Sequence, residues 1–437
     1  MVLAGEGGFL APFFGSARAG SCCEVLEKGK SMSRLTKKIA LTLSVLILGY
    51  VGMGFVLGKS NDDKTYRALT VYSEVLQHIQ RDYVDDPDMH QVTNGALHGL
   101  LDALDPQSGY LSPLEYTDYK QKLESKGKGS AGMTVSKRFG YIAVVSVMPD
   151  SPAQKAGLHD GDVLESIAGF TSSQMSVGQA QALLAGEPGA IVKVSVIRRS
   201  KPEPEELNLT LAKMGPPRLL EDKMQDDIAY LRVQGFDTGM SKQIREKLAQ
   251  FEKQGAKKLI FDLRDCSTGD IAEGISTAQL FVPSGTISTL KGQTVSTDTV
   301  AAEAAKVAWK LPVSVLISNG TAGAAEIVAS AIGGNHRGET VGERTFGTAS
   351  VQKLIQLDDG AALILTVANY YTPDGKSIAA EGVAPTVEVN PYGDEAAVTD
   401  EEPSYPAPAG HAVSPTDPTV KKAIEILNGA PAARKAA

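Results

Sequence analysis

The apolar residues near the start of the chain follow two different patterns. Residues 39–58 form an uncharged, mostly apolar run, and about 20 such residues are enough to cross a bilayer as a helix. Residues 65–88 instead place apolar side chains three and four positions apart, as an amphipathic helix does. A second helix is expected over 91–104. The pattern predicts a membrane-spanning helix followed by an N-terminal helical region over residues 65–126.

The next segment, residues 127–214, alternates short apolar runs with turns. Between the runs lie two helix-like stretches, SPAQKAGL (151–158) and VGQAQALLAG (177–186). Short apolar runs bounded by turn residues are typical of strands. We therefore expect residues 127–214 to form a compact β-rich module with two helices.

From residue 227 onward, strand-like apolar runs alternate with helix-like stretches. The helices are expected at 240–254, 270–282 and 324–334. This βα alternation predicts an α/β layer domain, to which we assign residues 215–391. Residues 392–417 are rich in Pro, Ala and acidic residues, as disordered linkers are. Residues 418–437 are expected to hold a short C-terminal helix and a tail.

Charged residues on either side of the apolar run 39–58 predict its orientation. The cations Arg34, Lys37 and Lys38 precede the run, and Asp62 and Asp63 follow it. The positive-inside rule places residues 1–38 in the cytoplasm and the rest of the chain outside, on the periplasmic side of a bacterium. The true translation start is expected at Met32.

A cleaved signal peptide is the competing interpretation of this run. No A-x-A-like site follows it, which favours an uncleaved anchor. Gly54 and Gly58 form a GxxxG pair, which either supports pairing of membrane helices or reflects only glycines within a membrane helix.

Composition excludes several classes of function. Lys and Arg total 43 against 51 Asp and Glu, a net charge of −8, and an acidic chain offers no basic face for nucleic-acid phosphates. The three cysteines, Cys22, Cys23 and Cys266, give no disulfide framework. No Cys/His cluster has zinc spacing and no GxxxxGK[ST] loop is present. We expect no metal, no cofactor and no nucleic-acid partner.

One turn has the geometry of a catalytic site but lacks the reactive group. The strand-like run PVSVLI (312–317) leads into NGTAG and then into the expected helix at 324–334. A strand, a tight turn and a helix N-terminus can expose one side chain beside unpaired N–H groups. Here the turn carries Gly323, which has no side chain.

Several motifs, in this order, resemble the carboxyl-terminal processing peptidases, also called tail-specific proteases. LDPQSGYLSP (104–113) resembles their LDPHS-x-YL signature, and residues 151–169 resemble their embedded PDZ domain. Segments that resemble the protease core lie at 258–270, 339–352 and 365–389. The resemblance spans about residues 65–428. It implies an α/β protease core with an inserted PDZ domain, N-terminal helices and, with the apolar run, one N-terminal transmembrane helix.

The resemblance also implies a serine nucleophile, a lysine base and a glutamine that orients the lysine. Such a lysine must be neutral, so it is desolvated to lower its pKa. Aligned on Asn319 and Glu326, the serine position is Gly323. The lysine of a TFGK motif is replaced by Thr348, while the glutamine is present as Gln352.

The oxyanion region departs from the family pattern as well. The pattern DLRNNPGG, whose first Gly lends an N–H, appears here as DLRDCSTGD. That position is Thr268, so only Gly269 remains of the two glycines, and Ala324 is assigned to the same oxyanion region. A β-branched residue tolerates positive φ poorly, and Ser267 in place of Pro is expected to loosen the turn.

These departures predict a catalytically inactive core. Thr321, Ser350 and Cys266 are the candidates for a relocated site. Cys266 is chemically the best nucleophile, but no His or Lys is placed by sequence to activate it. The simpler interpretation is a small, partly buried residue.

The PDZ module keeps its expected peptide site. The N–H groups of Ala131, Gly132 and Met133 are expected to bind a peptide carboxylate while the peptide adds as a strand. Gly132 is alternatively an ordinary turn glycine. Lys126 and Lys128 either add positive charge or are solvated linker residues.

Two functions remain. The first is a membrane-anchored pseudopeptidase that binds protein C-termini as a scaffold, decoy or regulator, with a second copy or an active family relative as partner. The second is an active serine endopeptidase with a non-standard site. Substitution at positions 323, 348 and 268 together favours the first function. An engineered knockout would change only the serine, whereas changes at three separate places indicate natural loss of activity.

Overall fold

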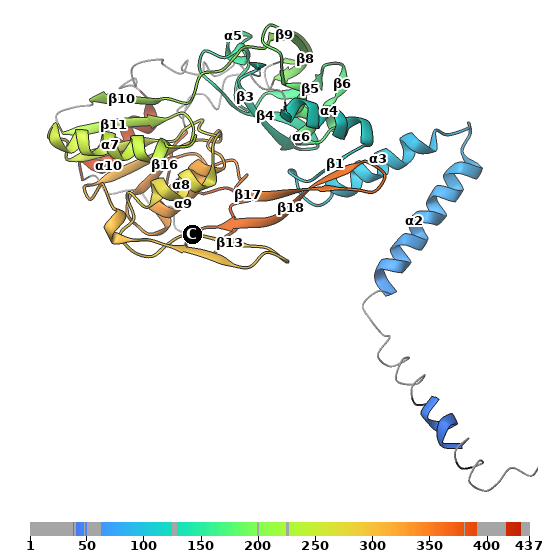
Figure 1. Ribbon diagram of the computed structural model, residues 1–437. Helices are drawn as coiled ribbons and strands as arrows, with labels where there is room; N and C mark the ends of the chain where they lie inside the picture. Colours follow the sequence, from blue (N-terminus) through green and yellow to red (C-terminus); the bar gives the residue numbers. More distant parts are fainter. Residues whose placement is uncertain are drawn as a thin grey trace, which may run out of the picture. The chain divides into compact units, whose positions relative to one another are not determined.

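The computed structural model describes most of the chain between residues 63 and 390, together with a C-terminal segment. The described residues are 38, 41–47, 49, 63–124, 129–198, 201–223, 227–379, 381–390 and 417–429. Residues up to Pro87 and residues from Asp88 onward form two separate units. The elements are drawn in Figure 1.

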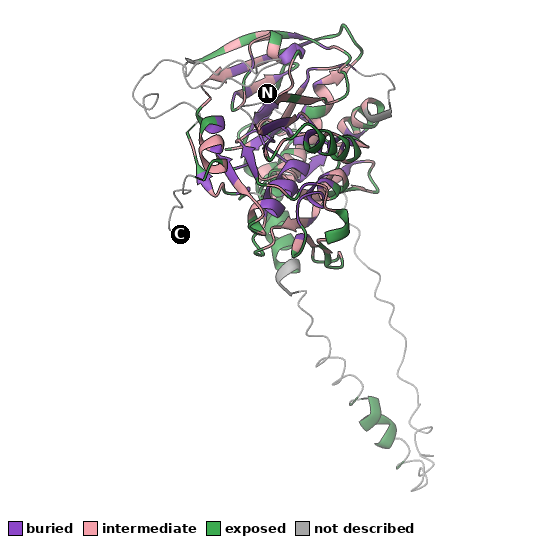
Figure 2. Cartoon of the chain, turned by 90° about the vertical axis from the view of Figure 1, so that its left-hand side faces the viewer, coloured by how far each residue is buried: buried purple, intermediate pink, exposed green. Residues whose placement is uncertain are grey.

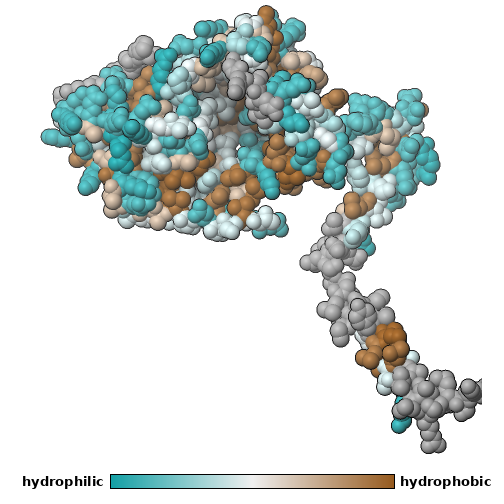
Figure 3. Space-filling view, in the orientation of Figure 1, coloured by the Kyte–Doolittle hydropathy of each residue, from teal (hydrophilic) through white to brown (hydrophobic). Residues whose placement is uncertain are grey.

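The predicted membrane run lies mostly outside the described residues. Of residues 39–58, only 41–47 and 49 are described, and these are helical. Figure 3 shows 41–47 as a strongly hydrophobic segment. Within the described part of the chain, no helix is both long and apolar enough to cross a membrane. Almost all of the predicted linker 392–417 also lies outside the described residues.

The first unit contains one long helix, α2 (Asp63–Asp82). It confirms the helix predicted from apolar spacing, although the helix ends before residue 88. It ends at Asp82, and Pro87 further along disfavours helical backbone at Asp86, so a helix that continues to residue 88 is not favoured.

The second unit begins with a helical segment. Asp88 caps α3 (Met89–Asp102) by accepting N–H groups from its first turn, and α4 (Pro113–Glu124) follows the short strand β1 (Gly109–Leu111). Between them, Asp105 accepts hydrogen bonds from the N–H and hydroxyl groups of Ser108 and from the Thr366 hydroxyl. The LDPQS motif therefore joins this segment to the strand that carries Thr366.

The PDZ-like module is a β sheet with two helices, as predicted. Its strands are ordered β3-β4-β5-β8-β9, with β6 beside β5, and β2 pairs with β7. Their bounds are β2 (Gly129–Ser130), β3 (Met133–Arg138), β4 (Tyr141–Val147), β5 (Val163–Ile167), β6 (Phe170–Thr171), β7 (Ala185–Gly186), β8 (Ile191–Arg198) and β9 (Lys201–Thr210). The helices are α5 (Pro152–Lys155) and α6 (Val177–Leu183), with a 3-10 turn η1 (Ser172–Gln174).

The α/β domain contains a six-stranded sheet, ordered β10-β11-β12-β15-β16-β19. All neighbours from β11 onward are parallel, and β10 is antiparallel to β11. The strands are β10 (Leu219–Lys223), β11 (Ile228–Val233), β12 (Lys258–Asp262), β15 (Val313–Ile317), β16 (Glu339–Gly342) and β19 (Val387–Glu388). Parallel neighbours agree with the βα alternation of the sequence.

Helices cover both faces of this sheet. One face packs against α7 (Met240–Lys253), α8 (Ile271–Ala278) and α9 (Ala324–Gly334) around the fully buried Trp309. The other face packs against α10 (Pro418–Leu427) through Val420 and Ala423. Figure 2 shows the buried interior of this domain. Each helix confirms an element predicted from apolar spacing.

A second sheet was not predicted from the sequence. It is ordered β1-β18-β13-β14, with β17 beside β18. Its members from the α/β domain are β13 (Thr286–Lys291), β14 (Asp298–Ala301), β17 (Ser350–Gln356) and β18 (Ala362–Tyr371), and a 3-10 turn η2 (Ala304–Lys306) follows β14. Because β1 precedes the PDZ-like module and pairs with β18, this sheet makes the module an insertion within one domain.

Candidate active site

The turn between β15 and α9 has the backbone of a nucleophile elbow. Gly323 takes φ 60° and ψ −116°, a region that favours glycine. A Cβ placed on Gly323 would have one non-neighbouring atom within 4 Å, Oγ1 of Thr348 at 3.9 Å. The predicted serine and lysine positions, called the dyad positions below, therefore face each other across open space.

Glu326 fastens the two dyad positions together. Its buried carboxylate accepts the N–H groups of Gly323 (2.9 Å), Gly347 (2.7 Å) and Thr348 (2.9 Å), and the Thr345 hydroxyl (2.5 Å). Burial raises the pKa of Glu326, and these four donors oppose the rise. This role of Glu326 was not predicted from the sequence, although a Glu in the first turn of a helix is a known partner for the N-terminal N–H groups.

Gln352 lies close to Thr348, the predicted base position, where the family's lysine is absent. Its Nε2 donates to Ser350 Oγ (2.7 Å), and the Ser350 hydroxyl donates to the Thr348 carbonyl (3.2 Å). The glutamine of the predicted triad is thus near Thr348 but contacts it only through Ser350.

The loop predicted to form the oxyanion hole, residues 263–270 (the oxyanion loop), is not strained at Thr268. Positive φ occurs at Gly269 (117°) and at Asp265 (58°), not at Thr268. A Cβ on Gly269 would lie 2.4–2.5 Å from the Phe236 backbone, so only glycine fits there. The expected conflict between a β-branched side chain and positive φ does not arise.

The expectation that Ser267 loosens this loop is wrong. Its hydroxyl donates to Thr134 Oγ1 (2.7 Å) and shares a hydrogen bond with Ser146 Oγ (2.5 Å). Both partners belong to the PDZ-like module, on β3 and β4. The Ser267 hydroxyl, a group that proline does not have, therefore connects the oxyanion loop to the PDZ-like module.

Two of the three candidates for a relocated nucleophile, Cys266 and Thr321, are buried. Cys266 is completely buried, and burial raises the pKa of its thiol strongly, which keeps it protonated. The buried Thr321 hydroxyl donates to the Leu263 carbonyl (2.8 Å) and accepts the Ser318 N–H (2.9 Å). The Ser350 hydroxyl accepts a hydrogen bond from Gln352 and donates one to the Thr348 carbonyl.

Ala324 begins α9 and is buried. Its carbonyl oxygen would lie 2.5 Å from a Cβ placed on Gly274, so α8 and α9 pack closely at this point. The role of Ala324 as an oxyanion donor stays a prediction.

The predicted carboxylate cradle of the PDZ-like module is only partly open. The Ala131 N–H donates to the Leu184 carbonyl (3.0 Å), so Ala131 was wrongly predicted as a free donor. The Gly132 N–H donates to Ser130 Oγ (3.0 Å). Gly132 itself takes φ 71°, and a Cβ there would lie 2.3 Å from Ser151 Cβ, so the backbone requires glycine at this position, and its role in carboxylate binding stays a prediction.

Met133 is the predicted donor that faces outward. It pairs with Val147 across β3 and β4, and the Val147 N–H donates to Asp160 rather than to β3. Met133 and Val147 are therefore a non-hydrogen-bonded antiparallel pair, in which both N–H groups point away from the partner strand. The Met133 N–H therefore points toward the free edge of β3. Lys126 and Lys128 lie outside the described residues.

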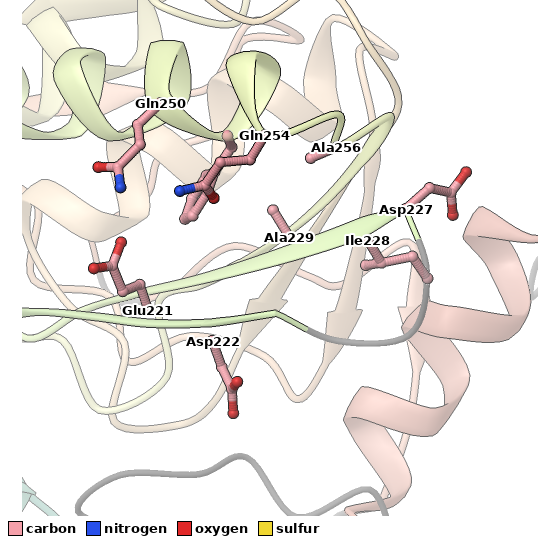
Figure 4. Close-up of a pocket in the computed structure, with 9 residues that line it drawn as sticks. Glu221, Asp222, Asp227, Ile228, Ala229, Gln250, Gln254 and Ala256 are labelled. Carbon is pink, nitrogen blue, oxygen red and sulfur yellow. The ribbon is translucent and has the colours of Figure 1, made fainter.

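A separate pocket of about 260 Å³ lies between α7 and strands β10 and β11. Figure 4 shows Gln250, Gln254 and Glu221 beside this space. It includes Ile228 and Ala229, at the start of β11, whereas the dyad positions follow the ends of the parallel strands. The pocket is therefore distinct from the candidate active site.

Comparison with known proteins identifies both modules. Residues 227–389 match the model of peptidase family S41, and residues 144–198 match a PDZ domain. The chain is also 29% identical over 353 residues to the carboxy-terminal processing protease CtpA of Bacillus subtilis, covering 80% of this chain and 75% of that protein. The chain therefore contains a peptidase family S41 domain and a PDZ domain, and it is a homologue of carboxy-terminal processing proteases. The PDZ match lies within the module described above.

A second relative and a solved structure give similar matches. A carboxy-terminal-processing protease of Bartonella bacilliformis is 29% identical over 337 residues, covering 76% of this chain and 77% of that protein. Among solved structures, the photosystem II D1 C-terminal processing protease aligns with a TM-score of 0.60 at 25% identity, covering 74% of this chain and 92% of that one. The α/β core with its PDZ domain is therefore the fold of a processing peptidase.

Proposed function

We propose that this chain is a membrane-anchored, extracytoplasmic pseudopeptidase of the carboxyl-terminal processing family. One observation carries the proposal: Gly323 and Thr348 face each other where the family's nucleophile and base belong, and neither supplies such a group. Glycine has no side chain, and a threonine hydroxyl does not accept a proton near neutral pH. The scaffold of the site is kept while its reactive groups are lost.

An active peptidase with a non-standard site is the competing function, and the described residues give it no support. Burial shields Cys266, and the Thr321 hydroxyl is used inside the loop. The test is a protease assay on an unfolded substrate, beside a variant in which Gly323→Ser and Thr348→Lys restore both groups.

Within this proposal the PDZ domain supplies the retained function, binding of protein C-termini. Its sheet and peptide-facing edge do not depend on the dyad positions, so peptide binding can outlast catalysis. The core then acts as a scaffold, or as a regulator of an active family relative that shares its partners.

We expect Ser130 to limit the affinity for a free C-terminus. The Gly132 N–H can reach a peptide carboxylate only after it leaves Ser130 Oγ. Ser130→Ala should strengthen binding of a peptide with a free, apolar C-terminus by about 1 kcal/mol, the usual net worth of one hydrogen bond. Calorimetry on the full chain measures this.

The matched control for this prediction is the same peptide with an amidated C-terminus. It has no carboxylate to use the released N–H, so Ser130→Ala should leave its affinity unchanged. Equal gains for both peptides, or equal affinities of both peptides for the unaltered chain, would contradict a carboxylate site at Gly132.

The proposed anchor is the run 39–58, supported by its apolar length and by the cations that precede it. A reporter enzyme fused after residue 65 should be active only if it is exported, and the full chain should sediment with membranes. A reporter that works in the cytoplasm, or a mature N-terminus beyond residue 58, would contradict the anchor.

We further propose that α2 pairs with α2 of a second copy. Four apolar residues of α2 are spaced alternately by three and four positions, the 3.5-residue period of paired helices. They are Leu69, Tyr72, Leu76 and Ile79. Leu69 and Tyr72 are exposed and Leu76 and Ile79 are partly exposed, so within the described residues this face is incompletely covered. The charged Arg67, Glu74 and Arg81 all fall on the opposite side of the helix.

The pairing of α2 predicts a dimer of the full chain in mild detergent. Leu76→Glu places a charge in the seam and should give a monomer, because burying an unpaired charge is costly. Gln77→Glu adds the same charge one position away, outside the seam, and should leave the dimer intact. Light scattering after size exclusion distinguishes these outcomes, and a monomeric unaltered chain would contradict the pairing.

A further inference from the structure

The PDZ domain contacts the core through loops of the candidate active site. On its side the contacts come from one face of β3 and β4, where Thr134 and Ser146 form a cross-strand pair. Both hydroxyls are hydrogen-bonded to Ser267 of the oxyanion loop. The substituted loop thus serves as a docking element.

Arg138 at the end of β3 extends this contact. Its guanidinium donates to Asn319 Oδ1 (3.4 Å) in the turn before α9, and lies 5.0 Å from the ring centroid of Phe346. Asn319 and Phe346 lie in the two loops that carry the dyad positions. The PDZ domain therefore contacts all three loops of the site.

Two carboxyl groups from different modules meet at this interface. Asp160 lies before β5 in the PDZ domain, and Asp265 lies in the oxyanion loop. A Cβ placed on Gly320 would lie 3.1 Å from Asp160 Oδ2 and 2.9 Å from Asp265 Oδ1, so both side chains converge on that glycine. The other oxygen of Asp160 accepts the Val147 N–H (3.0 Å).

The charges around the pair differ for its two members. Asp265 forms an ion pair with Arg232 on β11 (2.9 Å) and accepts the Ser318 hydroxyl (2.9 Å). Burial raises the pKa of Asp160 well above its usual value, and the charge and hydrogen bond of Asp265 raise it further, while the Val147 N–H and Arg232 oppose the rise. Two like charges in one partly buried site cannot both ionise freely.

The remaining charged groups near Asp160 belong to its own module. His159 precedes it in the chain, and Asp162 follows at two positions. Asp162 lies 3.7 Å from Arg198, and its Oδ2 accepts the His159 N–H (2.9 Å). On the core side the charged groups are Asp265 and Arg232.

We propose that Asp160 and Asp265 form a pH-dependent latch that holds the PDZ domain against the substituted active-site loops. Below the raised pKa, protonated Asp160 donates a hydrogen bond to Asp265 and the interface is closed. As the pH rises through that pKa the proton is lost, two carboxylates face each other, and the stabilising contribution disappears. The latch rests on the interface alone and does not require an inactive core.

The latch is tested by measuring the distance between the two modules as a function of pH. The full chain in detergent, carrying Cys22→Ser and Cys23→Ser, takes spin labels at Lys193→Cys on β8 and Lys242→Cys on α7, both exposed positions. Cys266 is completely buried and stays unlabelled. Pulsed electron–electron resonance gives the distance distribution from about pH 5 to about pH 9, a range above the usual Asp pKa.

At the acidic end we expect one narrow distribution of the distance between the two spin labels. As the pH rises, a second, different distance should become more populated. Asp160→Asn should keep the narrow distance throughout, because its amide donates to Asp265 without titrating. Asp160→Ala should show the second distance at every pH. Asp150→Asn, at an exposed aspartate of the same module, should behave like the unaltered chain.

Three results would overturn the latch. They are a distance distribution that does not change with pH in the unaltered chain, an Asp160→Asn variant that titrates as the unaltered chain does, and an Asp160→Ala variant that stays closed. Because the Asn and Ala variants are expected to move in opposite directions, a general loss of structure cannot imitate both results.

Discussion

The full chain is expected to leave an unfolded protein substrate uncut, and restoring both dyad residues should produce cleavage. Removing one member of a catalytic unit costs up to about 10⁶-fold in rate. Gly323→Ser with Thr348→Lys places a hydroxyl and an amine on positions that already face each other. We expect a gain of about 100-fold or more over background, short of the full 10⁶, because Thr268 remains and the lysine site has not been adapted.

The control for this experiment separates chemistry from backbone strain. Gly323→Ala with Thr348→Lys adds a Cβ at the same φ of 60° and the same lysine, but no nucleophile, and should stay at background. Cleavage by the unaltered chain that disappears on Cys266→Ala or Thr321→Ala would contradict the loss of activity. A folded double variant with no gain would contradict preservation of the site's geometry.

The dyad positions could be predicted from the sequence because they are set by the spacing of residues within motifs. The segments around Gly323 and Thr348 keep the spacing of the family motifs, and in the structure a Cβ on Gly323 points at Thr348. The helices of the α/β core were likewise predicted, because their apolar faces repeat within one short segment.

Features that depend on distant parts of the chain were missed. The pairing of β1 with β18 joins residues on either side of the PDZ domain, and no local pattern reports such a pair. Ser267 was expected to loosen its loop, but its partners Thr134 and Ser146 come from another module. Likewise, the Ala131 N–H was expected to be free, but it donates to the Leu184 carbonyl, which lies far along the chain and could not be paired with it from the local sequence.

A buried ionic network behind the oxyanion loop is expected to dominate the stability of the core. The completely buried Asp262 accepts hydrogen bonds from the Tyr230 hydroxyl (2.6 Å) and from Arg264 (2.7 Å). Arg264 also donates to Asp417 (2.6 Å), whose side chain caps α10. One arginine therefore neutralises a buried carboxylate and fastens the C-terminal helix to the sheet.

The pKa of Asp262 shows how strongly it is held in its charged form. Burial raises this pKa, but the positive charges of Arg264 and Arg232 and the hydrogen bonds from Arg264 and Tyr230 outweigh burial and bring it to about 2. A depressed carboxyl pKa contributes stability above the usual Asp value of about 3.9, and that contribution is lost as the pH falls toward the depressed value.

Arg264→Met is expected to lower the free energy of unfolding by about 3–5 kcal/mol, the usual cost of leaving one partner of a buried ion pair alone. Arg218→Met, at an exposed arginine, is the matched control and should change stability by less than about 0.5 kcal/mol. Denaturant midpoints at several pH values measure both.

Without Arg264, burial should raise the pKa of Asp262 above its unfolded value. The variant should then recover part of its loss as the pH is lowered from about 7 to about 5, because protonation removes the unpaired charge. A loss no larger than that of the control, or no recovery at lower pH, would show that Arg264 does not neutralise Asp262 in the folded chain.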